Sequence, residues 1–164
     1  MIGKALGAQI IGIDISNEKL KTARSLGADK VINANDVNVV DAIFDLTNGG
    51  AHVSIDALGS KITCNNSISC LRKRGKHVQI GLLAGKESNP QIPMSKVISG
   101  ELEILGSHGM QAHKYYEMFQ LMKEGKLDPG KLIGKIITLE ESLIELTEMN
   151  NFKGVGVTVI NMEL

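Results

Sequence analysis

The chain has 164 residues, of which 43% are hydrophobic and 22% are charged, an ordinary composition for a globular protein with one sizeable core. Its 18 basic side chains balance its 18 acidic ones, so the net charge of zero argues against a nucleic-acid or membrane-surface partner. No apolar run approaches the ~20 residues that span a bilayer, and the N-terminus lacks the features of a signal peptide. Cys64 and Cys70 fit no metal or disulfide spacing. We therefore expect a cytoplasmic protein with two free, buried thiols.

The first informative stretch follows a short helical segment that ends at Gly7. The apolar run from Gln9 predicts a strand buried on both faces, and the strand ends on the carboxylate of Asp14. Ser16 offers an N-cap for a helix over 17–26. In dinucleotide folds an acid in this position accepts hydrogen bonds from the adenosine ribose and repels a 2′-phosphate, which favours NAD over NADP. The alternative, on these residues alone, is that Asp14 only caps the helix.

Strands and helices then alternate along the chain. We expect strands at 30–33, 51–58, 76–80 and 101–106, with helices from Asp36 to about 46, over 61–71 and shortly before 99. This rhythm predicts a doubly wound, mostly parallel α/β sheet. It changes near Ser107, which divides the chain into segments 1–107 and 108–164.

The second segment has an α+β pattern. An amphipathic helix carries Tyr115, Met118, Phe119 and Met122 on one face and stops at Gly125. Strands are expected at 132–137 and 155–160. Between them, Thr138 and Glu141 form a capping box for a helix through Asn150.

Placed in order, these pieces resemble the C-terminal half of a medium-chain, zinc-type alcohol dehydrogenase. The resemblance covers residues 1–164, and its separate motifs keep the same order and spacing. They are KALGAQIIGIDISNEKLKTARSLGADKVINA at 4–34, VSIDALGS at 53–60, LRKRGKHVQIGL at 71–82 and LEILGSHG at 102–109. The resemblance implies a Rossmann-like sheet that lacks its first strand and the glycine-rich turn, followed by a segment that packs with the family's catalytic domain.

The resemblance also implies NAD as cofactor and assigns contacts to it. Asp14 would take the ribose hydroxyls with Lys19 beside the same ribose, although Lys19 also fits a solvated helix lysine. Ala57 and Leu58 would flank the adenosine, or else simply pack in the core.

Further along the chain, the resemblance places Ile80, Gly81 and Leu82 beside the nicotinamide. Glycine lets the backbone approach a flat ring. Ser107 and His108 would meet the carboxamide, although His108 also fits a turn histidine without a role. Val157 stands where the family often has a basic residue near the pyrophosphate, which puts that contact in question.

The implied parent reaction is hydride transfer between an alcohol substrate and the nicotinamide, with a zinc ion that polarises the substrate oxygen. The family's zinc ligands lie outside these residues, so we expect no catalytic residue and no metal site in this chain, and no activity from it alone. Two alternatives stay open. One is a non-catalytic oligomerising or NAD-sensing module, and the other is a fragment of a zinc-free quinone oxidoreductase of the same superfamily. We also expect a homo-oligomer, because surfaces that usually face the rest of the protein would be exposed.

Overall fold

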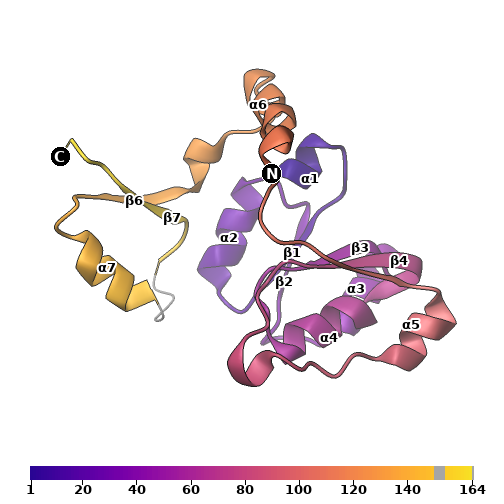
Figure 1. The fold of residues 1–164 in the computed structure, drawn as a ribbon. Helices are drawn as coiled ribbons and strands as arrows, with labels where there is room; N and C mark the ends of the chain where they lie inside the picture. The colour runs from indigo at the N-terminus through magenta and orange to yellow at the C-terminus, as the bar shows by residue number, and fades with distance from the viewer. Residues whose placement is uncertain (150–153, 164) are drawn as a thin grey trace. The chain divides into compact units, whose positions relative to one another are not determined.

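A computed structural model of the chain describes residues 1–149 and 154–163 (Figure 1). The chain forms two compact units, one of Met1–Asn33 with Ala112–Leu164 and one of Ala34–Gln111. No helix of the described residues is long and apolar enough to cross a membrane.

The first unit begins with a strand–helix–strand motif. After the short helix α1 (Ile2–Ala5), strand β1 (Ile11–Asp14) leads into helix α2 (Asn17–Ser25) and strand β2 (Lys30–Asn33). The two strands are parallel, with Asp14 opposite Asn33 at their carboxyl ends. Leu20 of α2 and Ile32 of β2 form a small core, each less than one-tenth exposed. The predicted crossover unit is therefore present.

The second unit is a three-stranded parallel sheet with helices packed on it. Its strands β3 (Ala51–Asp56), β4 (Leu71–Gln79) and β5 (Glu103–Gly106) lie side by side in that order. Helix α4 (Lys61–Ser69) contacts β3 and β4, helix α3 (Val39–Thr47) contacts α4 and β3, and helix α5 (Met94–Gly100) contacts β4 (Figure 1). A short 3-10 helix, η1 (Gly85–Glu87), precedes α5.

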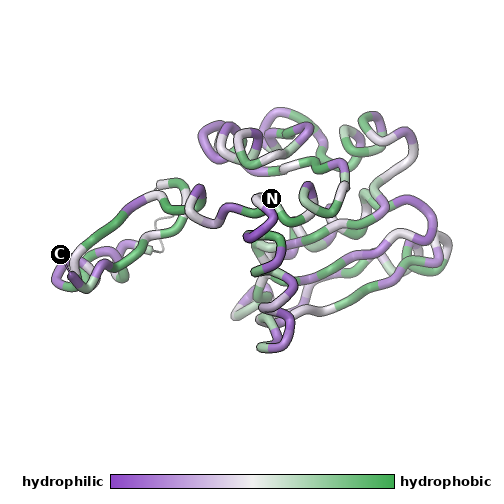
Figure 2. Tube along the Cα trace, turned by 90° about the horizontal axis from the view of Figure 1, so that it is seen from above, coloured by the Kyte–Doolittle hydropathy of each residue, from purple (hydrophilic) through white to green (hydrophobic). Residues whose placement is uncertain are grey.

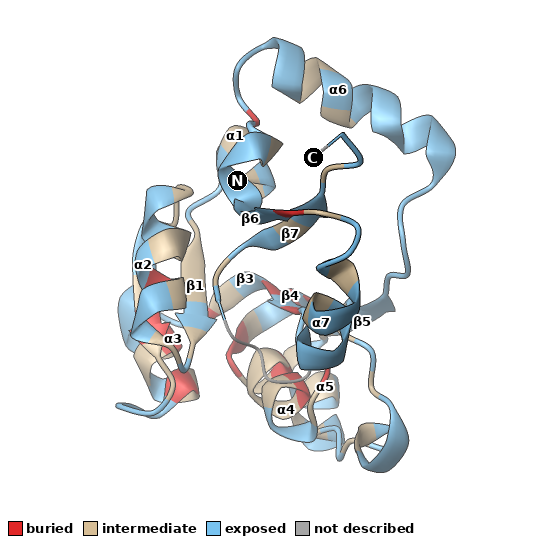
Figure 3. Cartoon of the chain, turned by 90° about the vertical axis from the view of Figure 1, so that its left-hand side faces the viewer, coloured by how far each residue is buried: buried red, intermediate tan, exposed pale blue. Residues whose placement is uncertain are grey.

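The core of this unit is formed by α3, α4 and β4. Figure 3 shows buried residues on these elements, and Ile68 and Leu71 are among the least exposed side chains. Cys64 and Cys70 are both buried and both free, as predicted.

The α/β class with parallel strands is confirmed, but the strands of the predicted sheet fall into two groups. Among the described residues, β1 pairs only with β2, and β3 pairs only with β4. No pairing joins β1 to β3 among the described residues.

The C-terminal part of the first unit consists of smaller elements. Its helices are η2 (Ala112–Lys114), α6 (Tyr115–Lys123), η3 (Pro129–Leu132) and α7 (Ser142–Glu148), and its strands are β6 (Ile133–Ile137) and β7 (Val157–Ile160). The two strands pair in parallel and carry runs of hydrophobic residues (Figure 2). The apolar face of α6 forms as predicted, but it is not buried, since Phe119 is 53% exposed.

Some predicted boundaries need correction. Asn38, not Asp36, caps α3, because its side-chain oxygen accepts from the amides of Val40 and Asp41. The strand predicted at 76–80 begins earlier, because β4 starts at Leu71, and the β3–β4 register shifts between the pairs Ala51–Leu71 and Val53–Lys76. The reciprocal bonds between Thr138 and Glu141 are confirmed, and they directly precede α7. The predicted end of that helix, Asn150, lies outside the described residues.

Candidate cofactor-binding site

Three of the predicted contact segments come together at one edge of the Ala34–Gln111 unit. Because β3, β4 and β5 are parallel neighbours, the segments that follow them emerge at the same edge of the sheet. The amide of Ser107 donates to the main-chain oxygen of Gln79 at 2.9 Å, which ties the end of β5 to the end of β4. The predicted residues placed at this edge are Ala57, Leu58, Ile80, Gly81, Leu82, Ser107 and His108.

The turns after β3 and β4 pass each other in direct contact. A Cβ atom built on Gly81 would lie 2.3 Å from the nitrogen of Gly59 and 2.5 Å from the carbonyl carbon of Leu58. A Cβ on Gly59 would lie 2.5 Å from the carbonyl oxygen of Leu82, and Gly59 also has a φ of +81°. Both positions therefore require glycine, and the close approach that Gly81 allows here is to a neighbouring turn.

Asp56 holds both turns, the first through its carboxylate and the second through its main chain. Asp56 is the last residue of β3 and only 3% exposed. Its Oδ1 accepts from the amides of Leu58 at 3.0 Å and Gly59 at 3.1 Å. Its main-chain oxygen accepts from the amides of Ile80 at 2.9 Å and Gly81 at 2.8 Å. Four amides from two turns thus converge on one residue.

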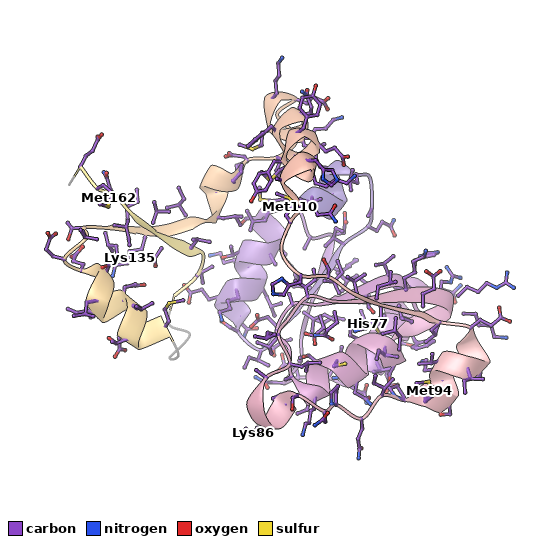
Figure 4. All side chains as sticks on the ribbon, in the orientation of Figure 1. His77, Lys86, Met94, Met110, Lys135 and Met162 are labelled. Carbon is purple, nitrogen blue, oxygen red and sulfur yellow. The ribbon has the colours of Figure 1, made fainter. Side chains whose placement is uncertain are left out.

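A buried polar chain continues from Asp56 into the interior. Gln79 Nε2 donates to Asp56 Oδ2 at 2.8 Å and to the main-chain oxygen of Gly81 at 2.9 Å. Its Oε1 lies 3.1 Å from Nε2 of His77, which is 1% exposed and lies on β4 (Figure 4). Because both amide hydrogens of Gln79 go to acceptors, Oε1 must accept, so the imidazole carries its proton on Nε2.

The far end of this chain is closed by two hydroxyls. Nδ1 of His77 accepts from Ser54 Oγ at 3.3 Å and from Ser67 Oγ at 3.1 Å. Burial, and to a lesser extent the charge of Asp56, raises the pKa of the neighbouring Cys64 thiol. Sequence reasoning missed Asp56, Gln79 and His77. The available signal was an acid and an amide at the last positions of two strands.

The side chains above these turns form an exposed apolar row. Leu58 is 65% exposed, Ile80 51% and Leu82 76%. Leu58 and Ala57 therefore do not pack in the core of their unit, which was the alternative explanation for their apolar character. Exposed apolar side chains on turns that are held by hydrogen bonds suit a flat aromatic ligand.

Asp14 and Lys19 belong to the other unit. Asp14 ends β1, is half-buried, and accepts from the amide of Ser16 at 2.9 Å through Oδ1. Ser16 Oγ accepts from the amide of Lys19 at 3.4 Å, so Ser16 is the N-cap of α2. Ser16, not Asp14, therefore caps the helix, and the Asp14 carboxylate binds the amide of that capping residue. A carboxylate can accept about four hydrogen bonds, so the bond to Ser16 does not by itself use up the acceptor sites that two ribose hydroxyls would need.

The remaining candidate positions lie on exposed parts of the chain. His108 is exposed, and Val157 on β7 is 56% exposed. Within the described ranges, no group of three or more His, Cys, Asp or Glu side chains could hold a metal ion. His52 lies 2.6 Å from an Arg72 guanidinium nitrogen and is engaged there.

Comparison with known proteins gives a consistent result. A family model described as "Zinc-binding dehydrogenase" matches residues 1–124. The NAD-dependent alcohol dehydrogenase of Sulfurisphaera tokodaii is 34% identical over 161 residues, which cover 97% of this chain and 45% of that protein. The sorbitol dehydrogenase of Halalkalibacterium halodurans is 29% identical over 143 residues, or 85% of this chain and 41% of that protein. The chain therefore spans less than half the length of these curated relatives.

Solved structures agree with the fold. The crystal structure of an NAD-dependent alcohol dehydrogenase superposes with a TM-score of 0.87 and 26% identity, over 98% of this chain and 46% of that one. The alcohol dehydrogenase of Aeropyrum pernix superposes with a TM-score of 0.80 and 28% identity, over 94% of this chain and 43% of that one.

Proposed function

The chain belongs to the zinc-binding dehydrogenase family, and on that premise we propose that it is the cofactor-binding part of an NAD-dependent, zinc-type alcohol dehydrogenase. The observation that carries the proposal is the gathering of three turns at the carboxyl edge of β3, β4 and β5. In open α/β sheets, ligands bind outside the carboxyl ends of the strands. The alcohol dehydrogenases among its relatives support NAD as the cofactor.

Each part of the candidate site has a role in this proposal. Asp14 accepts the ribose hydroxyls beside Lys19, and its charge disfavours a 2′-phosphate. Ala57 and Leu58 flank the adenosine by apolar contact. Ile80, Gly81 and Leu82 support the nicotinamide, and the main chain of Ser107 and His108 meets the carboxamide.

The described residues fit the cofactor but not the zinc ion. Asp14 has unused acceptor capacity and the apolar row is exposed, as a dinucleotide requires. No ligand set for zinc is present in the described part of the chain. In the proposed parent enzyme, zinc and the substrate pocket belong to another segment, so this chain alone is expected to bind cofactor without turning over an alcohol. The division into a dinucleotide-binding segment, 1–107, and a segment that packs with the catalytic domain, 108–164, belongs to the same proposal.

Two further features of the chain belong to the proposal. Strand β5 forms an open edge of its sheet with Ile104 39% and Leu105 45% exposed, which favours a homo-oligomer through edge pairing. The two free thiols favour a reducing, cytoplasmic setting.

NAD titration followed by NMR tests the proposed function. We expect NAD to shift the amide signals of Leu58, Gly81 and Ser107 together with Asp14, while NADP shifts them less at equal concentration. Affinity should be weak, because the 164 residues contain no glycine-rich turn to hold the pyrophosphate. An Asp14→Asn variant should lose the preference for NAD, with Asp36→Asn, an exposed acid outside the site, as control.

Two outcomes would count against the argument. The absence of any shift at millimolar NAD, or shifts confined to residues outside these turns, would refute the cofactor role. Micromolar affinity would instead refute the argument that the missing turn is needed for phosphate binding.

A further inference from the structure

We propose that Asp56 and Gln79 are positioning residues that lock the turns after β3 and β4 into one rigid cofactor platform. This inference rests on the proposed function and deepens it, because it names the groups that fix the candidate platform without touching the cofactor. Asp56 accepts from two amides of the first turn through its side chain and from two amides of the second through its main chain. Gln79 then joins the Asp56 side chain to the carbonyl of Gly81.

The hydrogen bond between Asp56 and Gln79 can form in one direction only. Asp56 Oδ2 is an acceptor and Gln79 Nε2 is a donor, and the other end of the Gln79 amide is fixed because Oε1 accepts from His77. His77 is in turn fixed by the hydroxyls of Ser54 and Ser67 on its other nitrogen. The amide of Gln79 therefore cannot rotate by half a turn without breaking three hydrogen bonds.

Burial makes this pair consequential. Asp56 is 3% exposed and Gln79 is half-buried, so a partner that the Asp56 carboxylate loses is not replaced by water at low cost. A hydrogen bond to an ionised acceptor is also stronger than one between neutral groups. The turns carry the exposed apolar row, so a weaker link between Asp56, Gln79 and the Gly81 carbonyl would let that row move.

Isosteric substitutions that reverse the polarity provide the sharpest test. Asp56→Asn sets the new Nδ2 against Gln79 Nε2, donor against donor. Gln79→Glu sets two carboxylate oxygens against each other. The double variant Asp56→Asn/Gln79→Glu restores one donor and one acceptor at this contact and leaves the volume unchanged. It does not restore the bond to the main-chain oxygen of Gly81, because a carboxylate oxygen cannot donate there.

We expect each single variant to accelerate hydrogen exchange at the amides of Leu58 and Gly81 by at least about tenfold. The double variant should return the rate at Leu58 to within about threefold of the wild type, while the rate at Gly81 stays raised because the bond to its carbonyl is not restored. A role in packing alone predicts no such recovery, because all three variants have the same shape. Ile68→Val changes a buried residue of the same unit that takes no part in these hydrogen bonds, and it controls for general destabilisation.

NAD affinity gives the second readout. The single variants should weaken binding by about tenfold or more, and the double variant should bind more tightly than either of them, while Ile68→Val leaves the affinity near the wild-type value. Exchange rates that stay unchanged in the single variants, or a rate at Leu58 that does not recover in the double variant, would overturn the positioning role. A wild-type chain with protected turn amides that binds no NAD would refute the proposed function instead, and with it the purpose of the platform.

Discussion

Alanine at position 81 is the most direct test of the crossing between the two turns. The added Cβ would lie 2.3 Å from the nitrogen of Gly59, 2.5 Å from the carbonyl carbon of Leu58 and 2.7 Å from that of Ala57. All three atoms belong to the main chain, so no side chain can rotate away to make room. Gly106 at the end of β5 is the matched control, because nothing lies within 4 Å of a Cβ built there.

The expected cost follows from this geometry. An extra methyl group forced into a packed interior costs about 1–3 kcal/mol. Separating the turns would also stretch the bonds from the Ile80 and Gly81 amides to Asp56, at 2.9 and 2.8 Å, each worth about 0.5–1.5 kcal/mol. We therefore expect Gly81→Ala to lower the free energy of unfolding by about 3 kcal/mol, a fall in Tm of roughly 12–24 °C for a unit of this size.

Circular dichroism is the suitable assay, since the chain contains no tryptophan for fluorescence. Urea and thermal unfolding of Gly81→Ala and Gly106→Ala should be compared with the wild type under the same conditions. Gly106→Ala should change stability by less than about 0.5 kcal/mol. Equal stability of the two variants would show that the turns can separate freely, and that the close crossing does not require glycine at position 81.

Two further predictions concern the C-terminal strand pair and the sheet edge. The hydrogen bond from Lys135 Nζ at 2.8 Å is the main cause that lowers the pKa of Glu145. Its contribution to stability is therefore present above the ordinary value of 4.5 and lost as the pH falls through the lower folded-state pKa. The protection of the β6 and β7 amides, taken as the ratio of the intrinsic to the observed exchange rate at each pH, should fall on acidification in the wild type but not in Glu145→Gln, and parallel pH profiles of this protection would contradict the prediction. Ile104→Lys should convert the expected oligomer to a monomer in light scattering, because a charge on an edge strand blocks pairing, whereas a monomeric wild type would contradict edge pairing.

The local sequence determined most of the elements and their order. Strand β2 has the predicted bounds, Lys30–Asn33, because a β-branched run there is set off by neighbouring breakers. Ser16 caps α2, as predicted, because a hydroxyl bonds to an amide only three residues ahead. The alternation of strands and helices was enough to predict parallel pairing, and with it the edge at which the candidate site lies.

Only the tertiary structure decided how that edge is built. Asp56 and Gln79 are 23 positions apart in the sequence, and neither residue type by itself predicts that the two side chains form a hydrogen bond. Gly81 looked like a residue made for a flat ligand, yet its missing side chain first makes room for the backbone of Gly59. Contacts between distant segments depend on the packing of whole strands, so local periodicity can place the turns at one edge but cannot reveal which atoms hold them together.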